Sequence, residues 1–234
     1  MQAVLFDWGN TLVGDVTTDE LVREATDAGL AAIGRHDLPP CGALMAAFTE
    51  REAQLAPPDH HDEPDLVAIY AGCFDQLGSP LSDEELETYL EGLHGLWAER
   101  EHPHPDAHRL LDAVRSRGLR LAIVGNVVSP RRFLEPMLER QGLLGRVDAV
   151  VFSSDVGKRK PHPAPFRRAL TAIETQPEDA VFVGDRLYED VLGASRLGMR
   201  TVQATWFVED DNERGGTPDH RAASPLDILD FVDG

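Results

Sequence analysis

The stretch from Ala3 to Leu12, AVLFDWGNTL, decides the fold of this chain. It opens with a short apolar run, Val4 to Phe6, of a kind that is typical of a fully buried strand. Asp7 ends the run, and the turn-forming residues Gly9 and Asn10 follow. Open α/β sheets bind ligands at the carboxyl ends of their parallel strands, so Asp7 is either a functional carboxylate or only a cap on the turn.

Strands and helices alternate over the second half of the chain. The patterns predict strands at 119–124, 147–152, 180–183 and 200–204, and helices at 106–117, 130–141, 164–173, 190–197 and 225–231. Strands that alternate with helices of this length form a parallel sheet with right-handed crossovers. Residues 1–13 and 103–234 are therefore expected to form a doubly wound α/β core.

Residues 14–102 differ from this core, because no good strand pattern occurs among them. The spacing of apolar residues predicts helices at 19–33, 42–55 and 65–77. A fourth helix is expected to begin at Ser82, which stands in capping-box register with Glu85. We therefore expect residues 14–102 to form an all-helical domain inserted into the core.

The chain is strongly acidic, with 41 acidic against 22 basic residues and a formal net charge of −19. This balance argues against nucleic acid and anionic membranes as partners, and it means that an anionic substrate needs a local positive site. The two cysteines, Cys41 and Cys73, match no metal-binding spacing. No signal peptide precedes the first strand and no apolar run is long enough to span a bilayer, so we expect a cytoplasmic protein.

The stretch from Ser153 to Pro165, SSDVGKRKPHPAP, indicates where that positive site lies. It holds the only lysines of the chain, Lys158 and Lys160, and three prolines stiffen it. A rigid loop that carries an ammonium to a carboxylate cluster would hold the cluster together and neutralise a phosphate. The alternative is two solvated surface lysines, although other basic positions in this chain take arginine.

The stretch from Ala180 to Met199, AVFVGDRLYEDVLGASRLGM, carries two further carboxylates. A buried strand leads into Asp185, and Asp190 is expected to open the next helix. Near Asp7, these two side chains would form a hard-oxygen site that suits Mg²⁺. For Asp190, a helix N-cap is an equally good interpretation.

Together these motifs resemble those of the haloacid dehalogenase (HAD) superfamily. In order they are Asp-x-x-x-Thr-Leu after the first strand, a helical insertion, a strand that ends in a small residue and Asn, Gly-x-x-Lys-Pro-x-Pro, and Gly-Asp-x-x-x-x-Asp. The resemblance covers essentially the whole chain, with the insertion at the usual position of a helical cap. It implies a Rossmann-like core, a mobile cap, Mg²⁺, and phosphoryl transfer through an aspartyl-phosphate.

The resemblance also implies roles for individual residues. Asp7 matches the nucleophile, and Lys160, directly before Pro161, matches the lysine that stabilises it. Asp185 matches a metal ligand, and Asp190 matches a metal ligand or an acid just outside the ligand set. The main-chain carbonyl of Gly9 would supply a further Mg²⁺ ligand.

The sequence departs from the superfamily's phosphatases at the position two residues after the nucleophile. That position usually holds an Asp that transfers protons, and here it is Gly9. Loss of proton transfer by a positioned side chain typically slows a reaction by about 10² to 10⁴. A histidine among residues 14–102, namely His36, His60 or His61, could supply the proton instead. The safer interpretation is that all three lie in solvated loops.

A second departure lies at the end of the second core strand. The superfamily usually has Ser or Thr there to bind the phosphate, and here Gly125 is followed by Asn126. Loss of one such donor costs a rate factor of about 10² to 10³. Asn126, a main-chain N–H or Ser129 could replace the donor, so the expected substrate-binding residues are Gly125, Asn126 and Lys160.

These features predict a Mg²⁺-dependent phosphatase of a small phosphorylated metabolite, slowed by the two departures. The first alternative is a catalytically degenerate member that binds a phosphorylated ligand or a protein partner. The second is a 2-haloacid dehalogenase, a class that resembles this chain in lacking the second Asp but works without Mg²⁺. The superfamily's phosphonate hydrolases need a lysine from the cap, and residues 14–102 contain none.

Overall fold

The core of the protein is one six-stranded sheet in which every neighbouring pair of strands is parallel. The computed structural model describes residues 1–14, 18–55 and 60–233. The strand order is β3-β2-β1-β4-β5-β6, so the first strand lies in the middle of the sheet and the chain winds outward from it in both directions. The strands are β1 (Ala3–Phe6), β2 (Arg120–Gly125), β3 (Ala149–Phe152), β4 (Ala180–Gly184), β5 (Arg200–Ala204) and β6 (His220–Ala222). The predicted doubly wound α/β core is confirmed.

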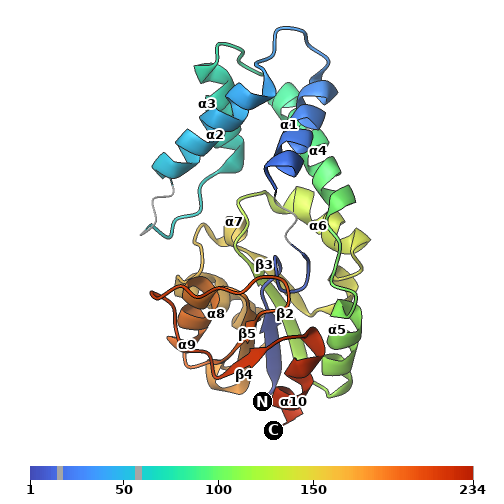
Figure 1. The fold of residues 1–234 in the computed structure, drawn as a ribbon, viewed down its shortest axis with the longest axis vertical. Helices are drawn as coiled ribbons and strands as arrows, with labels where there is room; N and C mark the ends of the chain where they lie inside the picture. The colour runs from blue at the N-terminus through green and yellow to red at the C-terminus, as the bar shows by residue number, and fades with distance from the viewer. Residues whose placement is uncertain (15–17, 56–59, 234) are drawn as a thin grey trace.

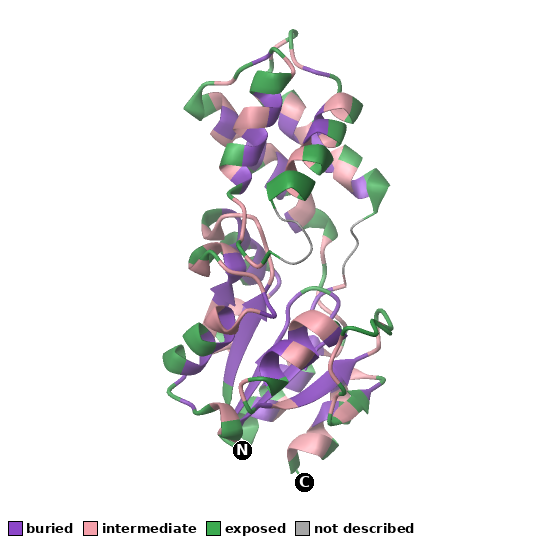
Figure 2. Cartoon of the chain, turned by 90° about the vertical axis from the view of Figure 1, so that its left-hand side faces the viewer, coloured by how far each residue is buried: buried purple, intermediate pink, exposed green. Residues whose placement is uncertain are grey.

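Alternate residues of the central strands pack on opposite faces of the sheet. Val4 and Phe6 face a hydrophobic cluster formed with α5 (Ala107–Ser116) and α6 (Arg131–Arg140). Ala3 and Leu5 face a second cluster formed with α8 (Pro163–Ala172). Burial on both faces explains why β1 is a continuous apolar run, and Figure 2 shows the buried strands between partly exposed helices.

Short helical segments complete the core. They are α7 (Ser153–Val156), α9 (Gly193–Ser195), α10 (Ile228–Asp233), the π-helical turn η3 (Leu187–Leu192), and the 3₁₀ turns η1 (Leu144–Arg146), η2 (Pro177–Asp179) and η4 (Pro225–Asp227). The predicted helix at 225–231 is thus a 3₁₀ turn followed by α10. The sequence analysis did not predict β6 or α7. Among the described residues, no helix combines the length and the apolar character needed to cross a membrane.

Four helices form a separate layer above the carboxyl ends of the strands (Figure 1), and we call them the helical region. They are α1 (Asp19–Ile33), α2 (Cys41–Leu55), α3 (Leu66–Gln76) and α4 (Asp83–Arg100). All four lie where the sequence predicted them, and the capping box of Ser82 and Glu85 begins α4. They bury a hydrophobic cluster of their own, to which α6 adds Phe133. The assignment of 14–102 as an independent domain stays a prediction.

The two chain segments that join the helical region to the core lie side by side. The Gly14 amide donates to the carbonyl of His102 at 3.3 Å, and the His104 amide donates to the carbonyl of Leu12 at 2.8 Å. Val13 and Pro103 form an isolated antiparallel bridge between these contacts. Both connections therefore enter the core at one place, beside the residues that follow β1.

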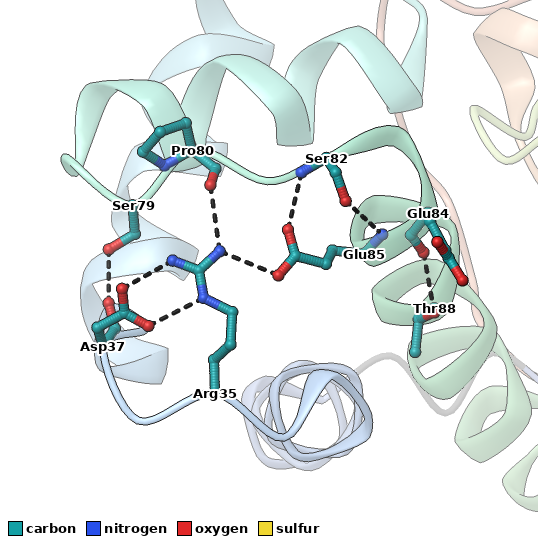
Figure 3. A network of polar contacts seen from close by, with 8 residues as sticks. All are labelled: Arg35, Asp37, Ser79, Pro80, Ser82, Glu84, Glu85 and Thr88. Atoms are coloured by element: carbon teal, nitrogen blue, oxygen red, sulfur yellow. Dashed lines mark hydrogen bonds and ion pairs between the residues drawn. The ribbon is translucent and has the colours of Figure 1, made fainter.

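An arginine network fixes the end of the helical region that is far from the sheet (Figure 3). The Arg35 guanidinium donates to both carboxylate oxygens of Asp37, to the carbonyl of Pro80 and to Glu85. Ser79 donates to the carbonyl of Asp37 at 2.7 Å. These contacts tie the loop after α1 to the start of α4, and several shared hydrogen bonds make this network firmer than one exposed ion pair.

Helices α1 and α4 approach closely because glycine lies at their contact. A Cβ atom on Gly29 would lie 2.7 Å from the ring and the carbonyl oxygen of Tyr89, a fully buried residue of α4. Gly95, on the exposed side of α4, has no atom within 4 Å of the same position. The absence of a side chain at Gly29 therefore allows this packing.

We predict that Gly29→Ala lowers the free energy of unfolding by about 1 to 3 kcal/mol, because Tyr89 has to move. The matched control Gly95→Ala should raise it by about 0.5 to 1 kcal/mol, since alanine is the better helix former. Urea denaturation followed by circular dichroism measures both. Equal effects of the two substitutions would contradict the close approach of α1 and α4.

Candidate active site

Two of the predicted carboxylates lie side by side because they follow adjacent parallel strands. Strands β1 and β4 pair in a register that places Phe6 opposite Val183. The residues after these strands, Asp7 and Asp185, therefore emerge at the same edge of the sheet. The Asp7 amide extends the pairing by donating to the carbonyl of Val183 at 2.8 Å. Both side chains are buried, and Asp185 is only 2% exposed.

Lys160 lies between two carboxylates at this edge. Its ammonium Nζ donates to Oδ1 of Asp7 at 2.6 Å and to Oδ1 of Asp190 at 2.6 Å. The residue is 3% exposed. Burial alone would lower the pKa of Lys160, but Asp190 and Asp7 outweigh burial and raise it, so the ammonium stays charged. The loop from Ser153 to Pro165 thus delivers one lysine to the carboxylates, as the sequence analysis expected.

The other lysine of that loop, Lys158, does not contact the carboxylate cluster. Lys158 forms an ion pair with Asp62 of the loop between α2 and α3. The backbone continues this contact, because the Arg159 amide donates to the carbonyl of His61 at 2.8 Å and the Glu63 amide donates to the carbonyl of Gly157 at 3.1 Å. Lys158 therefore connects the helical region to the core and lies outside the carboxylate cluster.

The position of Asp190 corrects the expected start of its helix. The sequence analysis placed Asp190 at the N-terminus of a helix at 190–197, but it lies inside η3, whose N-cap is Arg186. The Val191 amide reaches back five residues to the carbonyl of Arg186, at 3.2 Å, so the turn is wider than an α-helix. Oδ2 of Asp190 accepts from the Arg186 amide at 3.0 Å. In this turn the Asp190 carboxylate accepts from the Arg186 amide and from the Lys160 ammonium at the same time.

Asp7, Asp185 and Asp190 each offer one oxygen to a group in which all three atoms lie within 4.8 Å of one another. Oδ2 of Asp185 is buried and accepts no hydrogen bond. The Nε atom of Arg186 lies 3.2 Å from it, but in an orientation unsuited to donation, and the Arg186 side chain is half exposed. A buried carboxylate oxygen without a donor is the kind of atom that a cation satisfies.

The charges of the cluster also favour a bound cation. Burial raises the pKa of Asp7 to about 6, against the opposing effect of Lys160. Burial, with the nearby charges of Asp7 and Asp190, raises the pKa of Asp185 to about 8. With all three carboxylates ionised, the Lys160 ammonium and the half-exposed Arg186 guanidinium, whose Nε lies 3.2 Å from Asp185, compensate only part of the negative charge, and a divalent cation would compensate the rest. The donor set, all oxygen, therefore fits Mg²⁺.

The three acids do not fit a cation equally. Both oxygens of Asp190 are engaged, one by Lys160 and one by the Arg186 amide. Asp185 has the unsatisfied oxygen, and Asp7 shares only Oδ1 with Lys160. The geometry therefore favours Asp7 and Asp185 as ligands, with Asp190 as the residue that positions Lys160.

A cavity of ≈ 480 Å³, which we call the strand-end cavity, opens over the cluster. Its described lining is Asp7, Trp8, Gly9, Asn10, Val13, Gly14, Glu101, Gly125, Asn126, Val127, Arg159, Lys160, Asp185, Arg186, Glu189 and Asp190. The lining includes every site residue named from the sequence motifs. It does not include His36, His60 or His61, so this geometry favours the preferred interpretation of these histidines as solvated over the alternative that one of them supplies a proton.

Gly9 lies in open space within this cavity. A Cβ atom at Gly9 would meet nothing within 4 Å, and the glycine does not have a left-handed backbone. The missing acid is therefore not replaced by a side chain packed into its place. Outside the three-Asp cluster, the acidic residues in the described lining are Glu101 and Glu189.

Asn126 makes contacts that the sequence analysis did not foresee. Its Nδ2 donates to the carbonyl of Lys160 at 3.0 Å, and its Oδ1 accepts from the Lys160 amide at 2.7 Å. Both ends of the side chain therefore hold the backbone of Lys160. Ser129 is also engaged elsewhere, since its hydroxyl pairs with Nε2 of His94 at 2.9 Å. Asn126 also lines the strand-end cavity and its Nδ2 has a second N–H, so the expectation that it replaces the Ser or Thr absent at Gly125 stays a prediction.

Arg159 is a cavity residue that the sequence analysis missed. It precedes Lys160, lines the strand-end cavity, and has Nε 3.6 Å from Oε2 of Glu63. The Glu63 side chain is 1% exposed, and burial raises its pKa. The sequence offered one signal, an arginine directly beside the motif lysine, but the paired glutamate comes from a distant loop.

The chain resembles known proteins both in sequence and in fold. It is 29% identical over 176 residues to phosphoglycolate phosphatase of Aquifex aeolicus, covering 73% of this chain and 80% of the relative. It is 29% identical over 214 residues to glyceraldehyde 3-phosphate phosphatase of Pyrococcus abyssi, covering 88% and 81%. Its fold matches the crystal structure of 2-haloacid dehalogenase from Pseudomonas syringae pv. Tomato over 100% of this chain and 98% of that one, with a TM-score of 0.72 at 20% identity.

The last of these likenesses concerns the fold alone, because the sequence identity is low. The fold therefore does not separate phosphatases from dehalogenases, and the residues of the site have to do so. A family model for haloacid dehalogenase-like hydrolases matches residues 1–198. That match confirms the resemblance seen in the motifs, and the chain belongs to the haloacid dehalogenase-like hydrolases.

Proposed function

We propose that this hydrolase is a Mg²⁺-dependent phosphatase of small phosphorylated metabolites that reacts through an aspartyl-phosphate at Asp7. One observation carries the proposal: Lys160 holds Asp7 and Asp190, and beside them Asp185 keeps a buried oxygen without a donor. The names of the relatives, a phosphoglycolate phosphatase and a glyceraldehyde 3-phosphate phosphatase, support the same class of reaction.

The reaction begins with a carboxylate oxygen of Asp7 attacking the phosphorus of the substrate. A bond forms between that oxygen and phosphorus, the ester P–O bond breaks, and the organic alcohol leaves after it takes up a proton. Water then attacks the phosphorus of the acyl phosphate, loses a proton, and releases inorganic phosphate with Asp7 restored. The nucleophile has to be ionised for the first step, and the Lys160 ammonium 2.6 Å away favours that form.

In the proposed reaction, Lys160 also stabilises the transferring phosphoryl group. Its buried ammonium lies where negative charge gathers on the transferring phosphoryl group, and Asp190 and Asn126 fix its direction. Asp7 and Asp185, with the main-chain carbonyl of Gly9, would hold Mg²⁺. When bound, this ion neutralises phosphate charge and orients the phosphoryl group for attack.

Gly9 limits the step in which the alcohol leaves. No carboxylic acid occupies that position, so the leaving oxygen takes its proton from solvent or from a more distant protonated carboxylic acid. Turnover should therefore depend strongly on the acidity of the alcohol. Esters of acidic alcohols, such as aryl phosphates, should react faster than alkyl phosphates.

We further propose that residues 14–102 act as a cap over the site. The paired connections at Gly14 and His102 would serve as its hinges, since both enter the core at one place. The contact between Lys158 and Asp62 would hold the cap down on the opposite side. Closure of such a cap excludes water from a reacting phosphate.

The site favours this function over the two alternatives. A binding protein without turnover has no need of a lysine buried against two aspartates, because a buried cluster of charges costs desolvation free energy. A dehalogenase of the kind that works without metal has no need of the unsatisfied oxygen of Asp185, which suits a cation. Phosphatase chemistry uses both features.

We predict that Asp7→Asn abolishes phosphate release, because an amide is not a nucleophile towards phosphorus. The test uses a panel of phosphate esters and 2-haloacids, each with and without Mg²⁺, on wild type and variant. Phosphate release that requires both Asp7 and Mg²⁺ is the expected result. Metal-independent halide release, silence on the whole panel, or phosphate release by Asp7→Asn would each contradict the proposal.

We predict that Gly9→Asp raises kcat for alkyl phosphates by about 10² to 10⁴, since it supplies the missing acid in open space. The gain should be smaller for p-nitrophenyl phosphate, whose leaving group needs no proton. The isosteric control Gly9→Asn should give no gain. If a folded, Mg²⁺-binding Gly9→Asp enzyme gains nothing, another residue already supplies the proton.

We predict that Asn126→Ala lowers kcat about 100-fold with little change in KM, because a displacement of Lys160 near 1 Å has an effect of that order. The control is Asn212→Ala, an exposed residue whose side chain accepts from the Arg214 amide. A raised KM with unchanged kcat would show instead that Asn126 binds the phosphate.

A further inference from the structure

A second cavity, of ≈ 500 Å³, lies between the helical region and the core, and we call it the adjoining cavity. It shares five lining residues with the strand-end cavity: Trp8, Glu101, Asn126, Val127 and Arg159. A molecule whose phosphate lies at Asp7 therefore has its organic part directed towards the adjoining cavity. The chemistry of this second lining then indicates what that organic part is.

Large apolar side chains form most of the walls. The helical region contributes Phe48, Tyr70 and Trp97, and the core contributes Leu134 and Met137. The rings of Phe48 and Tyr70 pack on each other with centroids 4.9 Å apart. Such walls favour a bulky, mainly apolar group, for which burial of surface supplies the binding free energy.

One polar pair interrupts these walls, and its hydrogen-bond directions can be assigned. Nδ1 of His94 lies 2.7 Å from the carbonyl of Leu90, which can only accept, so Nδ1 carries the proton. Burial lowers the pKa of His94 to about 4, so the ring is neutral and Nε2 can only accept. The Ser129 hydroxyl, 2.9 Å away, must then donate to Nε2. Phe133 holds the ring in place by stacking on it at 4.3 Å.

This assignment fixes what Ser129 offers to a ligand. Its single proton is used by His94, so its oxygen has only lone pairs left for the cavity. A ligand group that meets Ser129 has to be a donor, such as a hydroxyl or an amino group. A ligand group that can only accept would form no hydrogen bond with Ser129, because the lone pairs of the two oxygens would repel each other.

The charged residues of the lining disfavour an anionic organic group. Asp19, Glu52 and Glu101 all line the adjoining cavity, and Arg159 is the one cation among its described lining residues. Arg159 already faces Glu63 at 3.6 Å. A carboxylate on the organic part of the substrate would therefore meet a surplus of negative charge.

We propose that the substrate is the phosphate monoester of a bulky, mainly apolar alcohol that carries a hydroxyl or amino donor and no carboxylate, with the donor hydrogen-bonded to Ser129. This inference rests on the proposed phosphatase function and deepens it. The inferred substrate differs from phosphoglycolate, the substrate named for one relative of this chain, because phosphoglycolate is small and carries a carboxylate.

Four esters test the proposal. Three share one alkyl leaving group and differ only at the ring: 2-(4-hydroxyphenyl)ethyl, 2-(4-methoxyphenyl)ethyl and 2-(4-carboxyphenyl)ethyl phosphate. The fourth is 2-phosphoglycolate. With Mg²⁺ present, kcat/KM should be about 3- to 10-fold higher for the hydroxyl ester than for the methoxy ester, as one hydrogen bond provides. The carboxyl ester and phosphoglycolate should be the poorest substrates.

A variant assigns the preference to Ser129. Ser129→Ala should bring the ratio of kcat/KM for the hydroxyl and methoxy esters to about one. The matched control Ser116→Ala, an exposed serine of α5, should leave the wild-type ratio unchanged. The ester series on the wild-type enzyme tests the same idea even if Ser129→Ala fails to fold.

The possible failures are distinguishable. Phosphate release from none of these esters nor from p-nitrophenyl phosphate would contradict the proposed function itself. Release with phosphoglycolate or the carboxyl ester preferred would leave the phosphatase intact and overturn this inference. A preference for the hydroxyl ester that persists in Ser129→Ala would also overturn it, since another residue would then recognise the donor.

Discussion

The contact of the Lys160 ammonium with Asp7 and Asp190 is the interaction that holds the candidate site together. It joins the end of β1, the loop after α7 and the turn η3, which are far apart in the sequence. Removal of one partner of such a buried pair costs about 3 to 5 kcal/mol, because a charge is left without compensation. In the proposed reaction the same contact favours the ionised form of Asp7, against the burial that raises its pKa to about 6.

The cluster buries more negative charge than the Lys160 ammonium compensates, and this constraint explains several features around it. Oδ2 of Asp185 has no donor, and burial with neighbouring carboxylates raises its pKa to about 8. In the proposed function, a divalent cation at Asp7 and Asp185 would remove that penalty and supply a local positive charge to which a phosphate can bind. The formal charge of −19 on the chain makes such a local site necessary, because the overall field repels an anionic substrate.

The sequence predicted the sheet and the carboxylates because both depend on local patterns. An apolar run followed by Asp7, with Asp185 after a second such run, is visible without coordinates. The bonds of Asn126 to Lys160 were out of reach, because they join residues 34 apart through side-chain directions. The wide turn at η3 was also missed, since no propensity distinguishes it from an α-helix that begins at Asp190. Strand β6 is a three-residue edge strand with polar residues, too short for a pattern.

Phosphoryl transfer to Asp7 can be observed by mass spectrometry of acid-quenched enzyme. The enzyme is quenched during turnover of p-nitrophenyl phosphate with Mg²⁺, and the peptide that begins the chain is analysed. We expect one phosphoryl group on Asp7 that disappears when the substrate is exhausted. A phosphoryl group on another residue, or steady turnover with an unmodified Asp7 under conditions that trap acyl phosphates, would contradict it.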